Sequence, residues 1–77
     1  MVVHDWGDAP QIHPSNIRVG DVIFALSRAH LCYTVKMISG PQASSGRWTF
    51  FGQDDQGMQH TDTYREDELV RRSAKAA

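Results

Sequence analysis

Residues 31–38 read Leu-Cys-Tyr-Thr-Val-Lys-Met-Ile and carry the clearest strand pattern in the chain. Leu31, Tyr33, Val35 and Met37 occupy alternate positions, which is the period of a β-strand. Aromatic and β-branched side chains also fit a pleated surface. We therefore expect one long strand here, with these four side chains on the same face.

Shorter strand patterns lie on both sides of this stretch, at residues 22–26, 47–52, 58–63 and 70–72. The first places Val22, Phe24 and Leu26 on one face. The pattern at 47–52 separates Phe50 from Phe51, because neighbouring side chains in a strand point to opposite faces. Five strands are expected in all, which predicts a small all-β domain.

Turn signals separate these strands. Val19-Gly20-Asp21 is typical of a turn that leads into a strand, and Asp54-Asp55-Gln56-Gly57 of a tight hairpin whose glycine adopts a positive φ. Residues 39–46 indicate a long loop, and residues 64–69 a single 3₁₀ turn before the last strand.

The ends of the chain show neither the two-residue period of a strand nor the 3.6-residue period of a helix. Residues 1–16 are interrupted by glycine, proline, serine and asparagine, which predicts a flexible N-terminal arm. The folded domain is expected over residues 17–72, followed by a frayed tail at 73–77.

Length and composition narrow the class of protein. A chain of 77 residues has room for one domain, and a domain of this size buries only about 60% of its unfolded surface. A partner subunit would offset that deficit, so a homo-oligomer, dimeric or tetrameric, is expected. One cysteine, Cys32, excludes an internal disulfide and fits a reducing cytoplasm. Eight Lys and Arg against nine Asp and Glu disfavour a dedicated DNA binder, and no apolar stretch is long enough for a membrane helix.

The order of these parts resembles the Src-homology-3-like (SH3-like) barrels, a family that includes Tudor-type domains. The resemblance is carried by Val19-Gly20-Asp21-Val22, by the hairpin at 54–57, and by Tyr64 with Leu69, and it spans residues 17–72. It implies a five-stranded barrel. This fold serves peptide, methyl-lysine, nucleic-acid and catalytic functions, so it does not choose among them.

The chain is also similar to one group with this barrel, the type II dihydrofolate reductases. The shared residues are Pro14-Ser15-Asn16, Gly20-Asp21, and Tyr64 followed by Leu69 and Arg71. Those enzymes are homotetramers with a shared pore lined by a Val-Gln-Ile-Tyr strand. Here the matching stretch is Thr61-Asp62-Thr63-Tyr64, and Ala25 stands where the family has a lysine. The amide and the cation that the family applies to its ligands are therefore missing.

The candidate site residues are mostly aromatic. Trp48, Tyr33 and Tyr64 could supply the rings of a cage for a methylated cation, or belong to the core. An outward Phe51 would mark a binding surface or an oligomer interface. His60 and Asp62 lie two apart on one strand face, where the carboxylate could orient the imidazole. A solvated polar edge is the simpler interpretation of that pair.

Arg47, Arg71 and Arg72 are the candidates for a local nucleic-acid contact beside Trp48. No metal-ligand spacing and no catalytic or cofactor signature appears. The sequence therefore favours a non-enzymatic binding or assembly module for a protein or small-molecule ligand. An oligomeric enzyme resembling the type II reductases and a single-stranded nucleic-acid binder are the alternatives.

Overall fold

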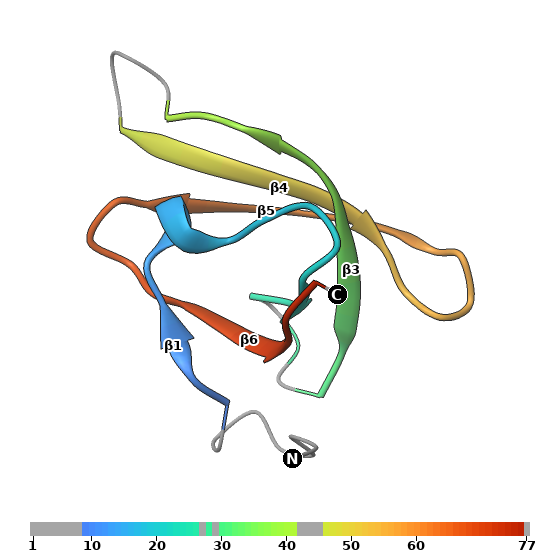
Figure 1. The fold of residues 1–77 in the computed structure, drawn as a ribbon. Helices are drawn as coiled ribbons and strands as arrows, with labels where there is room; N and C mark the ends of the chain where they lie inside the picture. Colours follow the sequence, from blue (N-terminus) through green and yellow to red (C-terminus); the bar gives the residue numbers. More distant parts are fainter. Residues whose placement is uncertain (1–8, 27, 29, 42–45, 77) are drawn as a thin grey trace.

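The computed structural model describes residues 9–26, 28, 30–41 and 46–76 (Figure 1). It contains one antiparallel sheet in the strand order β1-β6-β2-β3-β4-β5. The strands are β1 (Gln11–Ile12), β2 (Val22–Phe24), β3 (Cys32–Ser39), β4 (Arg47–Gln53), β5 (Gln59–Arg65) and β6 (Val70–Ala74). Among the described residues, the one helix is the short 3₁₀ helix η2 (Pro14–Asn16). The prediction of an all-β domain is confirmed.

The sheet differs from the predicted barrel in two ways. It has six strands rather than five, and in the described residues no backbone ladder joins its two edge strands, β1 and β5, so it is not closed. The additional strand comes from the segment expected to be an arm, because Gln11 and Ile12 pair with Arg71 and Val70 of β6.

The predicted arm therefore contains ordered structure. Pro14 begins η2 and is buried, and the His13 side chain accepts a hydrogen bond from the backbone N–H of Ser15, which caps the helix. The 3₁₀ helix thus lies near the start of the chain. At its expected place, residues 64–69, β5 continues to Arg65 and a β-turn follows, closed by the Glu68 N–H and the Arg65 carbonyl. Residues 1–8 of the arm lie outside the described part of the chain.

Both short turns have the predicted chemistry. In the first, Gly20 has a φ of 98°, and Asp21 accepts a hydrogen bond from the Arg18 N–H. In the hairpin after β4, Oδ1 of Asp54 accepts from the N–H groups of Gln56 and Met58, and Gly57 has a φ of 81°. Local side-chain bonds of this kind fix a turn independently of the rest of the fold.

A β-bulge in β3 changes the predicted alternation. Val35 pairs with Gly52 and Met37 with Phe51, which leaves Lys36 as the extra residue. One extra residue reverses the facing of everything after it. Tyr33 and Val35 consequently point into the core as predicted, whereas Met37 is turned outward and Ile38 packs inward.

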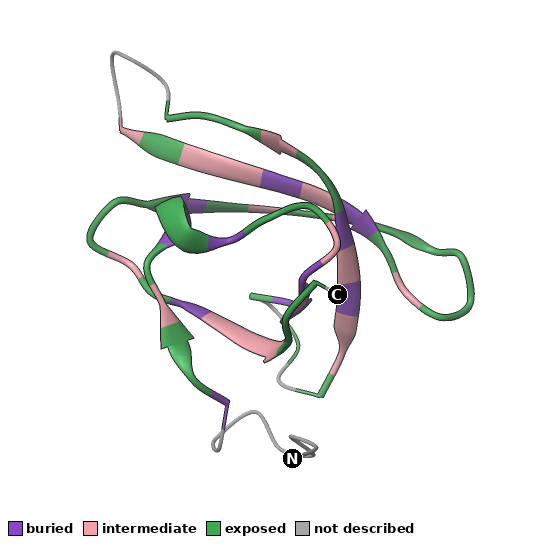
Figure 2. Cartoon of the chain, in the orientation of Figure 1, coloured by how far each residue is buried: buried purple, intermediate pink, exposed green. Residues whose placement is uncertain are grey.

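The register of β2 decides which side chains of residues 22–26 join the core. Ile23 pairs with Tyr33, and Ile23 and Ala25 belong to the core cluster, while Phe24 is also buried and Leu26 is 55% exposed. The inner face of the coiled sheet holds one buried apolar cluster (Figure 2). Its members are Ile17, Ile23, Ala25, Tyr33, Val35, Phe50, Tyr64 and Val70.

Candidate functional site

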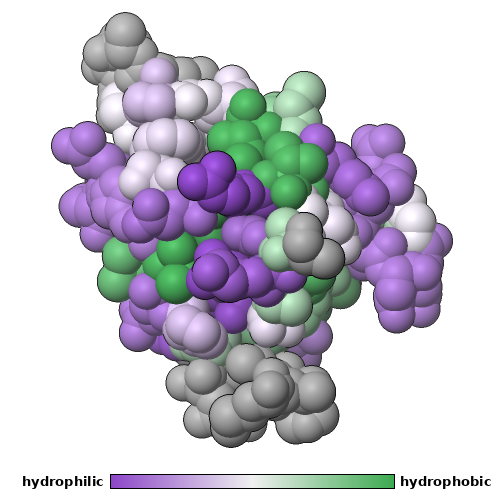
Figure 3. Space-filling view, in the orientation of Figure 1, coloured by the Kyte–Doolittle hydropathy of each residue, from purple (hydrophilic) through white to green (hydrophobic). Residues whose placement is uncertain are grey.

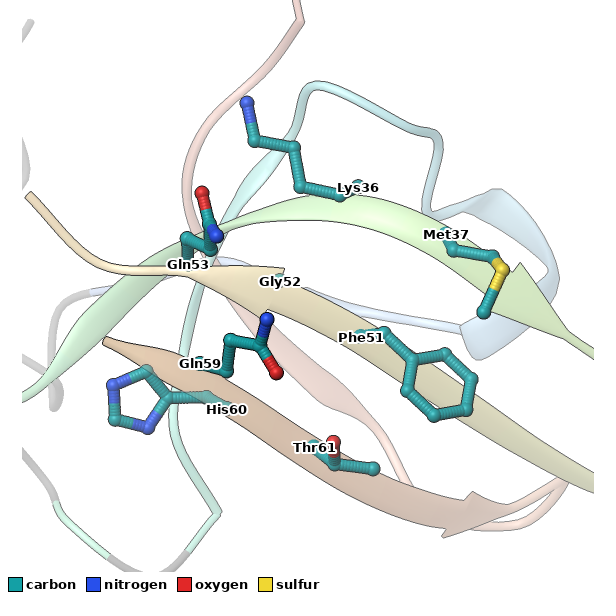
Figure 4. A pocket seen from close by; sticks show the side chains of 8 residues that line it. All are labelled: Lys36, Met37, Phe51, Gly52, Gln53, Gln59, His60 and Thr61. Carbon is teal, nitrogen blue, oxygen red and sulfur yellow. The ribbon is translucent and has the colours of Figure 1, made fainter. Parts of the chain in front are cut away.

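An apolar row crosses the outer face of the sheet from β3 to β5. Met37 pairs with Phe51, and Phe51 pairs with Thr61. Figure 4 shows these three side chains next to one another on three adjacent strands. Phe51 is half-buried and Met37 is 55% exposed, so part of each side chain stays open to solvent. Phe51 thus points outward from the sheet.

This row forms one side of a shallow cavity of about 350 Å³. Polar side chains from the three strands surround it, and Figure 4 shows the amides of Gln53 and Gln59 beside the Phe51 row. Lys36, the bulge residue, supplies the cation of the cavity wall. The cavity offers a ligand an apolar surface, two amides and one positive charge.

The inner side of β5 carries the other predicted pair, and the structure assigns each member a different partner. Nε2 of His60 donates to Oδ2 of Asp54, 2.8 Å away, rather than to Asp62. The His60 ring stacks on Tyr33, with centroids 5.3 Å apart. The hydrogen bond from His60 is the main reason that the pKa of Asp54 is below its ordinary value.

Asp62 is held by two other donors. The Tyr33 hydroxyl donates to its Oδ2 over 2.7 Å, and the Leu26 N–H donates to the same oxygen over 3.2 Å. Leu26 follows β2, which is three places from β5 in the sheet order. Asp62 therefore bridges the open side of the coiled sheet. Burial, and then the bond to Asp62, raise the pKa of Tyr33 well above its ordinary value.

The three rings considered for a cation cage do not surround an open space. Tyr33 and Tyr64 are 1% and 2% exposed, and Trp48 packs against the same core. Tyr64 lies against Phe50, with ring centroids 5.8 Å apart. These aromatics form part of the core, which was the other interpretation left open by the sequence.

The three candidate arginines are separated. Arg47 begins β4 and pairs in register with Arg65. Arg71 and Arg72 are adjacent in β6, so their side chains point to opposite faces of the sheet. Arg72 forms an ion pair with Asp21 at 3.4 Å. The structure therefore does not gather these side chains beside Trp48.

Sequence reasoning missed Lys36, Met37, Gln53 and Gln59 as cavity residues. The bulge that turns Met37 outward depends on pairing with β4, so β3 alone holds no signal for it. The outward position of Gln53 could have been predicted from the sequence, because Gln53 continues the alternation of Thr49 and Phe51.

Comparison of the chain with models of protein families found no match, and neither did comparisons with curated proteins and with solved structures. Within the described residues, no group of three or more His, Cys, Asp or Glu side chains could hold a metal ion. That same part of the chain has no helix with the length and apolar character to cross a membrane.

Proposed function

We propose that the chain is a small non-enzymatic binding and assembly module that works as a homo-oligomer, a dimer or a tetramer. Its scaffold is an open variant of the SH3-like barrel, with β1 added beside β6. The observation that carries the proposal is the exposed Met37–Phe51 row on the outer face of β3, β4 and β5. An apolar row of this kind, bordered by polar side chains, is typical of a protein interface.

The charge of this face favours a second copy as the partner. A two-fold interface brings a surface against itself, so charges of one sign would repel across it. The outer side chains next to the row are uncharged: Ser39, Thr49, Gln59, Thr61 and Thr63. Arg47 and Arg65 pair on the same outer face farther along β4 and β5, and Arg65 lies 3.6 Å from both Asp67 and Glu68. Asp62 points inward and is bonded to Tyr33, and Lys36 stands at the margin.

The position of β5 adds a second reason. It is a regular seven-residue edge strand whose ladder with β4 has no register shift. Long edge strands without a bulge or proline pair readily with another strand. Association along β5 would cover the edge and continue the sheet into a second copy, with the outer faces of the two copies side by side.

Sedimentation equilibrium over a wide range of protein concentration tests the proposal. We expect the wild-type chain to associate and Phe51→Ala to raise the dissociation constant at least about tenfold while keeping its fold, because truncating an interface anchor costs about 2 kcal/mol and about 1.4 kcal/mol is already tenfold. Leu69→Ala is the matched control, since Leu69 is 48% exposed but lies in the turn before β6. A wild-type chain that stays monomeric, or a Phe51→Ala chain that unfolds, would contradict the proposal.

No specific observation favours the reductase or the nucleic-acid alternative. Tyr64 and Ala25, at positions matched to the reductases, are buried in the core of the single chain. The candidate arginines are dispersed, as described above.

A further inference from the structure

A second cavity lies on a different part of the molecule, between η2, the turn before β2, and the end of β6. Its volume is about 390 Å³, within the range of small-molecule sites. It shares no lining residue with the outer-face cavity. Figure 3 shows strongly hydrophilic side chains gathered across this face, between η2 and the C-terminus.

Three cations from two segments line this second cavity: Arg18 before β2, and Arg72 and Lys75 in and directly after β6. Asn16 adds a side-chain amide from η2, and Asp21 is the one acid among the described lining residues. The lining thus carries three formal positive charges and one negative charge. The whole chain, by contrast, has a formal net charge of −1.

Asp21 is already fully engaged within the protein. Its side chain is 3% exposed, and it accepts hydrogen bonds from the backbone N–H groups of Arg18 and Ala76. Burial alone would raise the pKa of Asp21, but these bonds and the Arg72 charge outweigh burial and lower it. The acid is therefore ionised, and it positions the Arg72 guanidinium, which is 15% exposed, in the cavity wall.

From this arrangement we infer that the second cavity binds the phosphate group of a small molecule. One cation is balanced by Asp21, and the remaining excess of two matches a phosphate monoester, which carries nearly two negative charges at neutral pH. A held guanidinium can bind phosphate through two parallel bonds, and a lysine adds a mobile charge. Ile12 gives one apolar wall for the rest of the ligand.

Calorimetric titration with inorganic pyrophosphate tests this inference. We expect saturable binding that weakens with added salt, and a loss of at least about tenfold for Arg18→Gln and for Lys75→Gln, because each removes a charged contact. Arg28→Gln is the matched control, since it removes one exposed positive charge that lines neither cavity. Thermal unfolding of each variant verifies that it is folded.

Two results would overturn the inference. One is the absence of saturable pyrophosphate binding at low ionic strength, and the other is an equal loss in Arg28→Gln, which would indicate unspecific charge attraction. A second titration uses a single-stranded oligonucleotide without a terminal phosphate. The small-molecule site would be refuted if the protein bound this oligonucleotide more tightly than pyrophosphate and if that binding depended on Arg47, because the cations would then serve a nucleic-acid backbone.

Discussion

The bond between Tyr33 and Asp62 allows a direct test of how the open sheet is held together. Tyr33→Phe removes only the hydroxyl that donates to Asp62 over 2.7 Å, and it keeps the buried ring. A hydrogen bond to a charged group contributes about 1.5–3 kcal/mol. Asp62 is half-buried, so water replaces part of the lost bond. We therefore expect a loss of about 1–2 kcal/mol in the free energy of unfolding.

A double-mutant cycle separates this bond from its surroundings. Asp62→Asn removes the negative charge of the carboxylate that also accepts from the Leu26 N–H. It should therefore lower the free energy of unfolding at least as much as Tyr33→Phe does. The double variant should lose less than the sum, with a coupling energy of about 1 kcal/mol. Urea unfolding at one fixed protein concentration, followed by tryptophan fluorescence, measures all four chains.

Tyr64→Phe is the control for the cycle, because Tyr64 is about as buried as Tyr33, whereas the hydroxyl that donates to Asp62 is that of Tyr33. Its loss should stay below about 0.5 kcal/mol. A coupling energy between Tyr33 and Asp62 within about 0.3 kcal/mol of zero would refute the reasoning, since distant, independent sites behave that way.

Three further predictions concern the core. Phe50→Ala should reduce the free energy of unfolding by about 2–4 kcal/mol, because Phe50 is completely buried, and a loss below about 1 kcal/mol in urea would contradict that position. Gly52→Ala should lower the melting temperature, because the new Cβ would collide with the Thr34 carbonyl and lie 2.6 Å from the Tyr33 ring; an unchanged melting curve would show that the strands can separate there. Burial raises the pKa of both Tyr33 and Tyr64, so above about pH 10 the unfolded chain loses phenolic protons that the folded chain keeps. The contribution of these tyrosines to the free energy of unfolding should be fully present below about pH 10, and above it the free energy of unfolding should fall by about 1.4 kcal/mol per pH unit for each tyrosine. In urea unfolding measured over this pH range, Tyr64→Phe should halve the slope of the free energy of unfolding against pH.

The parts of the fold that the sequence could predict are those fixed by neighbouring residues. The hairpin at 54–57 and the turn at Arg18–Asp21 are each closed by an aspartate and a glycine within four residues. The prediction that Phe50 and Phe51 point to opposite faces was correct, because β4 keeps its alternation throughout. Such features need no information from distant strands.

The parts that failed depend on pairing between distant segments. Residues 22–26 are all apolar, so the sequence assigns neither of their faces to the core, and the register with Tyr33 places Ile23 there. The strand before the 3₁₀ helix is held by β6, almost sixty residues later in the chain. His60 and Asp62 are close in sequence, but the hairpin brings Asp54 to His60 and the curl of the sheet brings Tyr33 to Asp62.

The bulge at Lys36 makes the length of β3 as important as its composition. If Lys36 were paired in the ladder, strict alternation would turn Met37 inward and Ile38 outward. Deleting Lys36 would instead keep Met37 opposite Phe51 and Ile38 opposite Phe50, and would remove only the bend and added twist that a bulge gives its strand. One inserted residue therefore decides which of two neighbouring apolar side chains the outer face displays.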